Sequence, residues 1–342
     1  MTSSVHDGLS LHGSALADSG AEFRALLDHS GVYHLANRAK IALTGGDRTR
    51  WLNGMVTNNV RDLAVGHGVY AFLLNPQGHI LADLYAFNRG ESILLDTEES
   101  QEPKLLSTFD RYIIMDDVEV ADQSKHLTAL GIAGPNSRKT LESAGLTFPA
   151  LEPLQLVDIQ WQGQSVTVVC TDNPAIEGYE IWLAPESVES VLQSLTTLGS
   201  QLVGPEALEL LRVASGIPHY GRDIRERDLP QETEQQRALH FSKGCYVGQE
   251  IVERIRSRGA VHRKFTGFYV EGPLPEPGAK IQSDGKEIGE ITSVATLPAA
   301  DGMRRVALGY IRREVAIPGK QLIAGSSPLS VAALPFADVF RH

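Results

Sequence analysis

The chain has 342 residues, with 31 Lys and Arg against 42 Asp and Glu, so its formal net charge is −11. Hydrophobic residues make up 42% of it, which is ordinary for a globular protein and excludes wholesale disorder and collagen-like repeats. The acidic balance argues against broad nucleic-acid binding, and no run approaches the ~18 apolar residues of a membrane span. A chain of this length is expected to form about two or three domains.

The first 20 residues contain no Lys or Arg and are rich in Ser, Gly, Ala and His. Secretory signals begin with positive charge and transit peptides carry Arg, so we expect neither and interpret residues 1–20 as a mobile leader. The two cysteines, Cys170 and Cys245, show no spacing typical of a disulfide framework. We therefore expect a reducing, cytoplasmic location, with Cys170 in the core.

Short helical and strand-like patterns alternate from residue 22 onward. Residues 22–27 suit a helix, and apolar residues at helical spacing recur from Trp51 to Val56. Pro135 is expected to open a helix, and residues 208–213 to form one that ends before Gly216. Strands are predicted at residues 40–43, 69–74, 80–87, 93–95, 128–133, 166–170 and 179–183.

After about residue 259 the pattern changes to short β-rich runs broken by Gly and Pro. These runs lie at residues 266–270, 280–281, 288–294 and 305–310. They are typical of a small closed or nearly closed barrel, which places a boundary near residues 256–262. The sequence lacks a Walker A loop, a glycine-rich dinucleotide fingerprint, HExxH, a CxxC pair and G-x-S-x-G, so the common nucleotide, zinc and serine-hydrolase functions lack their residues.

The most informative segment is FSKGCYVGQE at residues 241–250. Two glycines flank a Cys–Tyr pair, and a helix is predicted to begin at about Gly248. A thiol at a helix N-terminus and two residues from Lys243 has two reasons to ionise, the helix dipole and a nearby cation. This predicts that Cys245 is a reactive or ligand-holding thiolate with Lys243 as its positive neighbour. The alternative is a small buried hydrophobe in a turn shaped by glycine.

Residues 243–250, KGCYVGQE, resemble the KGCYxGQE signature of the YgfZ family. That family resembles the glycine-cleavage T-protein, an aminomethyltransferase that uses tetrahydrofolate. Weaker similarities extend along nearly the whole chain from about Gly31. They include VTNNV at 56–60, GHILADL at 78–84, GYEI at 178–181 and IGEITS at 288–293. The chain departs from the T-protein pattern at His34, Asn59 and Ala82, each of which stands where an Asp is usual.

The resemblance implies roles for four further residues. Asp83 aligns with a carboxylate that T-proteins place against the reactive nitrogens of the folate, and Glu180 aligns with a carboxylate that clamps the pterin. Arg212 is implied to hold a folate carboxylate, and Tyr220 to stack on or bond the ligand. Each has a plainer alternative: an exposed strand residue for the two acids, a helix-surface charge for Arg212 and core packing for Tyr220.

A local basic cluster follows the signature in this acidic chain. It could hold the glutamyl tail of a folate, an RNA phosphate or a protein partner, or form a solvated helix end whose cations complement the helix dipole. Its members are Arg254, Arg256, Arg258, Arg263 and Lys264.

The implied fold is α+β and three-lobed, as in T-proteins. Two α+β domains (residues 21–257, split near 125) and a C-terminal β-barrel (residues 258–342) surround a central opening, with tetrahydrofolate or a one-carbon derivative as the ligand. No metal-ligand set is predicted.

Three functions stay open. The first is a folate-binding accessory factor in the assembly or repair of iron–sulfur proteins, with those clients or their assembly factors as partners and with Cys245, Lys243 and Asp83 as reactive groups. The second is an aminomethyltransferase, which the retained Asp83, Glu180 and Arg212 support. The third is a folate-binding scaffold without turnover, which the altered acidic positions favour. The KGCYVGQE signature is foreign to ordinary T-proteins and favours the first.

Overall fold

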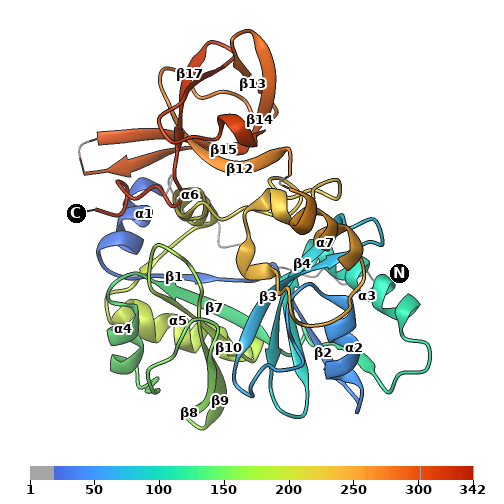
Figure 1. Cartoon of the computed structure of the whole chain (residues 1–342). Helices are drawn as coiled ribbons and strands as arrows, with labels where there is room; N and C mark the ends of the chain where they lie inside the picture. The colour runs from blue at the N-terminus through green and yellow to red at the C-terminus, as the bar shows by residue number, and fades with distance from the viewer. Residues whose placement is uncertain (1–18, 260, 301, 342) are drawn as a thin grey trace, which may run out of the picture.

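A computed structural model describes residues 19–259, 261–300 and 302–341, and it has three lobes (Figure 1). Two lobes are β-sheets flanked by helices, and the third is a closed barrel formed by the C-terminal strands. The predicted three-lobed α+β fold with a C-terminal barrel is confirmed. The predicted leader lies outside the described residues, except that Ser19 and Gly20 begin the first helix. No helix within the described ranges is long and apolar enough to cross a membrane.

The first lobe is a six-stranded sheet in the order β11-β1-β7-β10-β9-β8. Its strands are β1 (Gly31–His34), β7 (Thr128–Ala133), β8 (Leu156–Trp161), β9 (Gln164–Cys170), β10 (Gly178–Leu183) and β11 (Gln201–Leu202). The helices of this part of the chain are α1 (Ser19–Asp28), α4 (Ser137–Ser143), α5 (Val188–Thr197) and α6 (Pro205–Ser215). Leu141 of α4 and Leu195 of α5 pack against Ile132 and Ile181, so these two helices cover one face of the sheet. Helix α4 starts two residues after Pro135 rather than at it.

The second lobe is a five-stranded sheet in the order β3-β4-β5-β2-β6. Its strands are β2 (Arg38–Thr44), β3 (Gly68–Leu74), β4 (Ile80–Asn88), β5 (Ile93–Glu98) and β6 (Glu119–Asp122). Helices α2 (Arg48–Met55) and α3 (Glu102–Tyr112) pack on one face through Trp51, Leu52 and Phe109. The two sheets meet at Phe87 of β4 and Trp182 of β10, whose ring centres are 4.9 Å apart and whose planes are nearly perpendicular.

The barrel closes in the order β12-β15-β14-β13-β16-β17. Its strands are β12 (Arg263–Val270), β13 (Lys280–Ser283), β14 (Lys286–Ala299), β15 (Gly302–Arg312), β16 (Gln321–Ala324) and β17 (Ser327–Ala332). The last two are not among the predicted strands. Phe265, Leu308 and Phe336 pack with residues of α1 and α6, which joins the barrel to the first lobe.

The segment between α6 and the barrel positions most of the candidate site. It contains two short 3₁₀ turns, η3 (Pro230–Thr233) and η4 (Gln236–Ala238), and the helix α7 (Gln249–Arg258). Tyr246 and Val252 pack against Tyr70 and Phe72 of β3. This segment therefore covers the face of β3 and β4 opposite to α2 and α3.

Candidate functional site

Asp83 lies on the covered face of β4. The antiparallel register pairs Tyr70 with Tyr85 and Phe72 with Asp83, so these four side chains share one face of the sheet. Ala82 points the other way, into the hydrophobic core beneath α2 and α3. A carboxylate at position 82 would lie in that core rather than beside Asp83, so the loss of an Asp there leaves the Asp83 face unchanged.

Both carboxylate oxygens of Asp83 accept hydrogen bonds. Tyr70 Oη donates at 2.6 Å and Gln101 Nε2 at 2.8 Å, while the Asp83 amide donates to Gln101 Oε1 at 2.9 Å. Burial, and secondly the Asp83 charge, raise the pKa of Tyr70 well above its ordinary value. Tyr70 is therefore a neutral donor at physiological pH, and it fixes the orientation of the Asp83 carboxylate.

Arg237 of η4 joins this face to the other sheet. Its guanidinium carbon lies 4.4 Å from the centre of the Tyr70 ring, and Nη1 donates to Asp172 in the loop between β9 and β10. Tyr85 Oη donates to the same carboxylate at 3.1 Å. No sequence pattern points to Arg237 or Asp172, because residues 235–238 carry no recognisable motif and the partners are 65 positions apart.

Glu180 of β10 faces a cavity of about 180 Å³ between the two sheets, which Arg38, Tyr85 and Asp172 also line. Its Oε2 accepts a hydrogen bond from Trp182 Nε1 at 2.7 Å, and Lys40 Nζ lies 3.9 Å away. The Glu180 carboxylate is thus held in place from behind and stays accessible from the cavity.

A buried charge network lies behind Glu180. The Lys40 side chain is completely buried, and its Nζ lies 4.4 Å from the centre of the Trp182 ring and pairs with Asp96 at 2.8 Å. Burial alone would raise the pKa of Asp96, but Arg38 and Lys40 outweigh it and hold that pKa below its ordinary value. Asp96 therefore stays ionised and compensates the buried ammonium.

The guanidinium of Arg212 in α6 is hydrogen-bonded entirely to groups of the chain itself. Its five N–H donors are all used: two by Glu209, and one each by Asp223, Ser293 of the barrel and the Ile217 carbonyl, at 2.6–2.9 Å. The prediction that Arg212 holds a folate carboxylate is therefore not supported, because a ligand would have to displace one of these bonds. The residue instead ties α6 to the barrel.

Tyr220 lies close enough to Asp83 for that charge to affect its titration. Burial, and secondly Asp83, raise the pKa of Tyr220 to about 12. Its hydroxyl donates to the Leu81 carbonyl of β4. This places Tyr220 at the candidate site with its hydroxyl already engaged, which favours packing over a direct bond to a ligand.

Lys243 of the signature stabilises the C-terminal end of α2. Its ammonium donates to the Asn53 carbonyl and, at 2.7 Å, to the Val56 carbonyl. The Val247 amide adds a third bond, to the Gly54 carbonyl at 3.1 Å. These bonds satisfy carbonyl groups that a helix end leaves without an intrahelical partner. Burial lowers the pKa of Lys243 to about 7.

Cys245 is exposed, whereas Lys243 and Tyr246 on either side of it are buried. Gly244 and Gly248 both adopt positive φ angles, +96° and +81°, and a Cβ on Gly248 would lie 2.6 Å from the Asn75 carbonyl oxygen. The turn is thus fixed by its glycines and its buried neighbours while the thiol faces solvent.

The structure bears on two predictions about this thiol. The Lys243 ammonium donates to carbonyls of α2, and it also interacts electrostatically with Cys245, which acts to raise the Lys243 pKa against the larger effect of burial. Helix α7 begins at Gln249, four residues beyond Cys245, so the thiol does not stand at the helix N-terminus. Neither Cys245 nor Asp83 is among the residues that line the cavity at Glu180.

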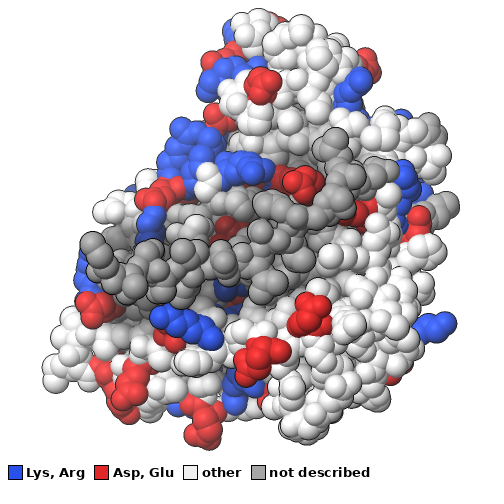
Figure 2. All heavy atoms as spheres, turned by 180° about the vertical axis from the view of Figure 1, so that it is seen from behind, with Lys and Arg blue, Asp and Glu red and all other residues white. Residues whose placement is uncertain are grey.

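Four of the five members of the basic cluster after the signature form ion pairs, and the side chain of the fifth, Arg258, lies outside what the structure describes. Arg254 pairs with Glu250 and Arg256 with Glu253, while the two barrel residues pair with acids of the preceding segment. Those barrel pairs are Arg263 with Asp228 and Glu232, and Lys264 with Glu234. On the face drawn in Figure 2, several of the visible Lys and Arg side chains lie beside Asp or Glu. Within the described ranges, no group of three or more His, Cys, Asp or Glu is arranged to hold a metal ion.

Comparison with known protein families agrees with this architecture. The family model described as the GCVT N-terminal domain matches residues 13–243. The chain belongs to the GCVT family. A second model, described as the CAF17 C-terminal beta-barrel domain, matches residues 254–337.

Relatives of this GCVT-family chain match over most of their length. An aminomethyltransferase from Rubrobacter xylanophilus is 28% identical over 321 residues, which cover 92% of this chain and 85% of the relative. A putative chloroplastic transferase from Arabidopsis thaliana is 26% identical over 86% of this chain and 68% of the relative. The crystal structure of the glycine cleavage system aminomethyltransferase T from Bartonella henselae has a TM-score of 0.84 at 23% identity and covers 94% of this chain and 90% of that one, which shows the shared fold.

The residues around the 180 Å³ cavity at Glu180 suit a pterin, the ring system of a folate. A carboxylate such as Glu180 accepts two hydrogen bonds from adjacent amino and ring N–H groups. Tyr85 and Phe87 supply aromatic walls, and Leu35 and Val169 add apolar surface. In this member of the GCVT family, groups suited to binding such a ring are therefore present between the two sheets.

Proposed function

We propose that this protein is a tetrahydrofolate-binding accessory factor of the YgfZ type that acts in the assembly or repair of iron–sulfur proteins in a reducing, cytoplasmic compartment. The observation that carries the proposal is the exposed Cys245, presented by a turn in which the flanking Lys243 and Tyr246 side chains are buried. Cysteines are among the most frequently buried residues, so an exposed thiol in a rigidly held turn favours chemistry with a partner over packing.

The turn has features suited to presenting a thiol. Lys243 and Val247 attach it to the end of α2, and Gly248 fits tightly against the loop between β3 and β4. The sulfur is thereby held at a defined position on the surface without being enclosed. Such a thiol is accessible to an iron–sulfur client protein or to an assembly factor.

The folate would occupy the space between the lobes. Glu180 would hold the pterin in the cavity between the sheets. The Asp83 carboxylate, oriented by Tyr70 and Gln101, does not line that cavity, and its proposed contact with the amine nitrogens that carry the one-carbon unit follows from the resemblance to T-proteins. Tetrahydrofolate supplies the one-carbon carrier when bound; the chain supplies the carboxylates that orient it.

The decisive experiment complements a strain that lacks its own copy of the gene. Wild type and Cys245→Ala are compared for the activity of iron–sulfur enzymes and for glycine cleavage, side by side. We expect the variant to fold and to bind tetrahydrofolate as the wild type does, but to lose the rescue of iron–sulfur enzymes. Full rescue by the variant contradicts the proposal.

A second function, folate-dependent aminomethyl transfer, is favoured by the retained Asp83 and by the names of the bacterial relatives. In that reaction the methylene of an S-aminomethyl group on a lipoyl protein would be transferred to two nitrogens of the folate, with release of ammonia and of the lipoyl thiol. Purified protein given tetrahydrofolate and an aminomethyl-lipoyl donor is expected to release no ammonia at enzyme-like rates. Robust release would place this function ahead of the first, and binding without either activity would support a scaffold.

A further inference from the structure

Two cavities meet at one acidic residue. The smaller, of about 180 Å³, lies between the sheets and contains Glu180. The larger, of about 530 Å³, lies between α6, η4 and the barrel. Asp172 lines both of them. Pockets for drug-sized ligands typically measure about 300–1,000 Å³, so the smaller cavity alone is too small for an elongated ligand and the larger one is not.

Arg237 and Asp172 lie at the boundary between the two cavities. Arg237 lines the larger cavity and donates from Nη1 to the Asp172 carboxylate, whose other oxygen accepts from Tyr85 Oη at 3.1 Å. Tyr85 lines the smaller cavity. A molecule that extends from the smaller cavity into the larger one must therefore pass this ion pair.

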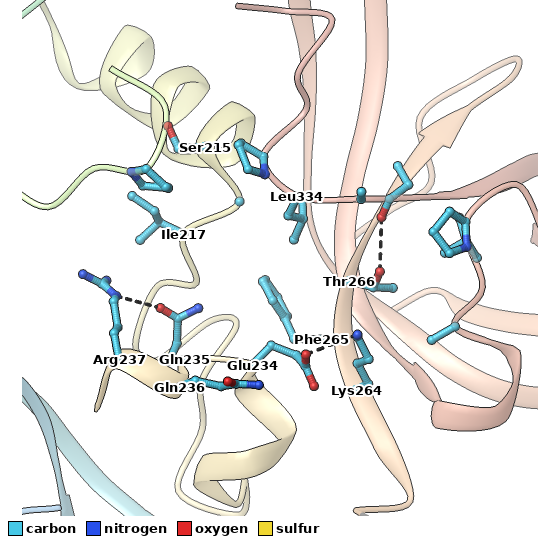
Figure 3. A pocket seen from close by; sticks show the side chains of 18 of the residues that line it. Ser215, Ile217, Glu234, Gln235, Gln236, Arg237, Lys264, Phe265, Thr266 and Leu334 are labelled. Carbon is cyan, nitrogen blue, oxygen red and sulfur yellow. Dashed lines mark hydrogen bonds and ion pairs between the residues drawn. The ribbon is translucent and has the colours of Figure 1, made fainter. Parts of the chain in front are cut away.

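The ionic groups of the larger cavity form two opposed pairs. Arg237 pairs with Asp172, and Lys264 of β12 pairs with Glu234 at 3.2 Å. Figure 3 shows Arg237 and Gln235 on one side of the cavity and Lys264 and Phe265 on the other. The guanidinium is stacked on Tyr70 and Nε donates to Gln235 Oε1 at 3.2 Å, so its position does not depend on Asp172 alone.

We propose that the Arg237–Asp172 ion pair separates the two cavities and that Arg237 selects ligands with a carboxylate-bearing tail. A tail that enters the larger cavity takes the guanidinium from Asp172, whose carboxylate keeps the Tyr85 hydroxyl as a donor. Arginine suits this exchange because its planar guanidinium binds carboxylates in a bidentate manner. The inference rests on the folate-binding function proposed above and assigns to Arg237 the role first expected of Arg212.

Calorimetric titration with two ligands tests this selection. Tetrahydrofolate carries the glutamyl tail, and 6-methyltetrahydropterin has the ring without it. We expect Arg237→Met to weaken tetrahydrofolate binding at least tenfold and to leave the pterin affinity within twofold of wild type. Glu180→Gln is expected to weaken both ligands. Asp172→Asn, which removes the anionic competitor, is expected to keep tetrahydrofolate affinity or to raise it two- to fivefold.

Controls separate this role from folding and from the proposed function. Arg222→Met removes an exposed arginine that pairs with Glu209 and is not among the described residues of either cavity, so it should change neither affinity. Arg237→Lys keeps the charge and provides a second test if the Met variant is unstable; it should lose tetrahydrofolate affinity selectively. If Arg237 variants weaken both ligands equally, or neither, the selection role is overturned. The proposal that the protein binds folate would still stand. A wild type that binds neither ligand overturns both proposals.

Discussion

The junction between α6 and the barrel differs from the junction between the two sheets in how its charges are used. At the first, all five N–H donors of Arg212 form hydrogen bonds within the chain, and its partner Asp223 is completely buried. At the second, Arg237 borders a cavity and pairs with an acid that borders two cavities. An arginine with every donor satisfied within the chain stabilises the fold, whereas the ligand exchange proposed for Arg237 depends on a partner that faces open space.

The largest expected effect is a loss of stability when Arg212, at the junction between α6 and the barrel, is replaced. Arg212→Ala leaves the buried Asp223 without its cation, and loss of one partner of a buried pair costs about 3–5 kcal/mol. Chemical denaturation should show this loss in the free energy of unfolding, with Arg212→Lys intermediate. If the Arg212→Ala protein is stable and its folate binding is selectively weakened, the prediction that Arg212 binds the folate is supported.

The next largest effect concerns the lysine that the signature directs at α2. Lys243→Met removes the donor from two buried carbonyl groups, and each unsatisfied group costs about 1–3 kcal/mol. We expect a total loss of about 2–4 kcal/mol in unfolding free energy by chemical denaturation, less than the sum for two groups because the Met variant also removes the desolvation cost of the buried ammonium. A loss below about 0.5 kcal/mol, the value for an ordinary surface substitution, would show that Lys243 does not stabilise the fold.

The same lysine predicts a pH dependence of stability. Its pKa is lowered in the folded protein from 10.5 to about 7, so between these values the unfolded chain binds the extra proton. Folding stability contributed by this group therefore rises as pH increases from about 7 to 10.5 and is constant below and above that window. Denaturation at about pH 7.5 and about pH 9.5, both inside the window, should show a larger gain for wild type than for Lys243→Met. Equal gains in the two proteins would contradict this assignment.

A smaller effect tests the ligand side of the comparison. Glu180→Ala removes a carboxylate whose hydrogen bonds to a pterin are expected to contribute roughly 1.5–3 kcal/mol. Calorimetric titration should show this loss in tetrahydrofolate affinity. Gln160→Ala, on the exposed part of β8, serves as the matched strand control. An unchanged affinity in the Glu180 variant would exclude the clamp.

The smallest effect on stability is expected at the signature thiol. Cys245→Ser changes an exposed side chain and should alter the unfolding free energy by less than about 0.5 kcal/mol. Thermal and chemical unfolding measure this directly. A large destabilisation would show that the thiol is needed for packing, and it would weaken the argument that the turn presents it to a partner.

The sequence predicts the elements better than it predicts the contacts of the charged side chains. Alternation predicts β4 at residues 80–87 against the observed Ile80–Asn88, because every second residue there faces the core. Strands β16 and β17 are missed, and the second contains Pro328, a residue that counts against a strand in a sequence pattern.

The expected contacts of the cations differ from the observed ones where the partners are distant in the chain. The carbonyl partners of Lys243 lie 187 and 190 positions away, and Ser293 lies 81 positions from Arg212. Spacing within a motif reports neighbours along the chain, whereas these contacts form only after the helices and the barrel have packed. Glu180 differs from both cations, because the resemblance to T-proteins points to it and the structure places it at a cavity wall.

The position of β1 has a consequence for dividing the molecule. The chain begins the six-stranded sheet with β1, builds the whole five-stranded sheet, and returns to complete the first with β7 to β11. Because β1 pairs with both β11 and β7, a polypeptide that started near residue 125 would present two unpaired strand edges. Such a fragment invites aggregation, so the two halves are better studied by joining them in a circularly permuted chain than by expressing them apart.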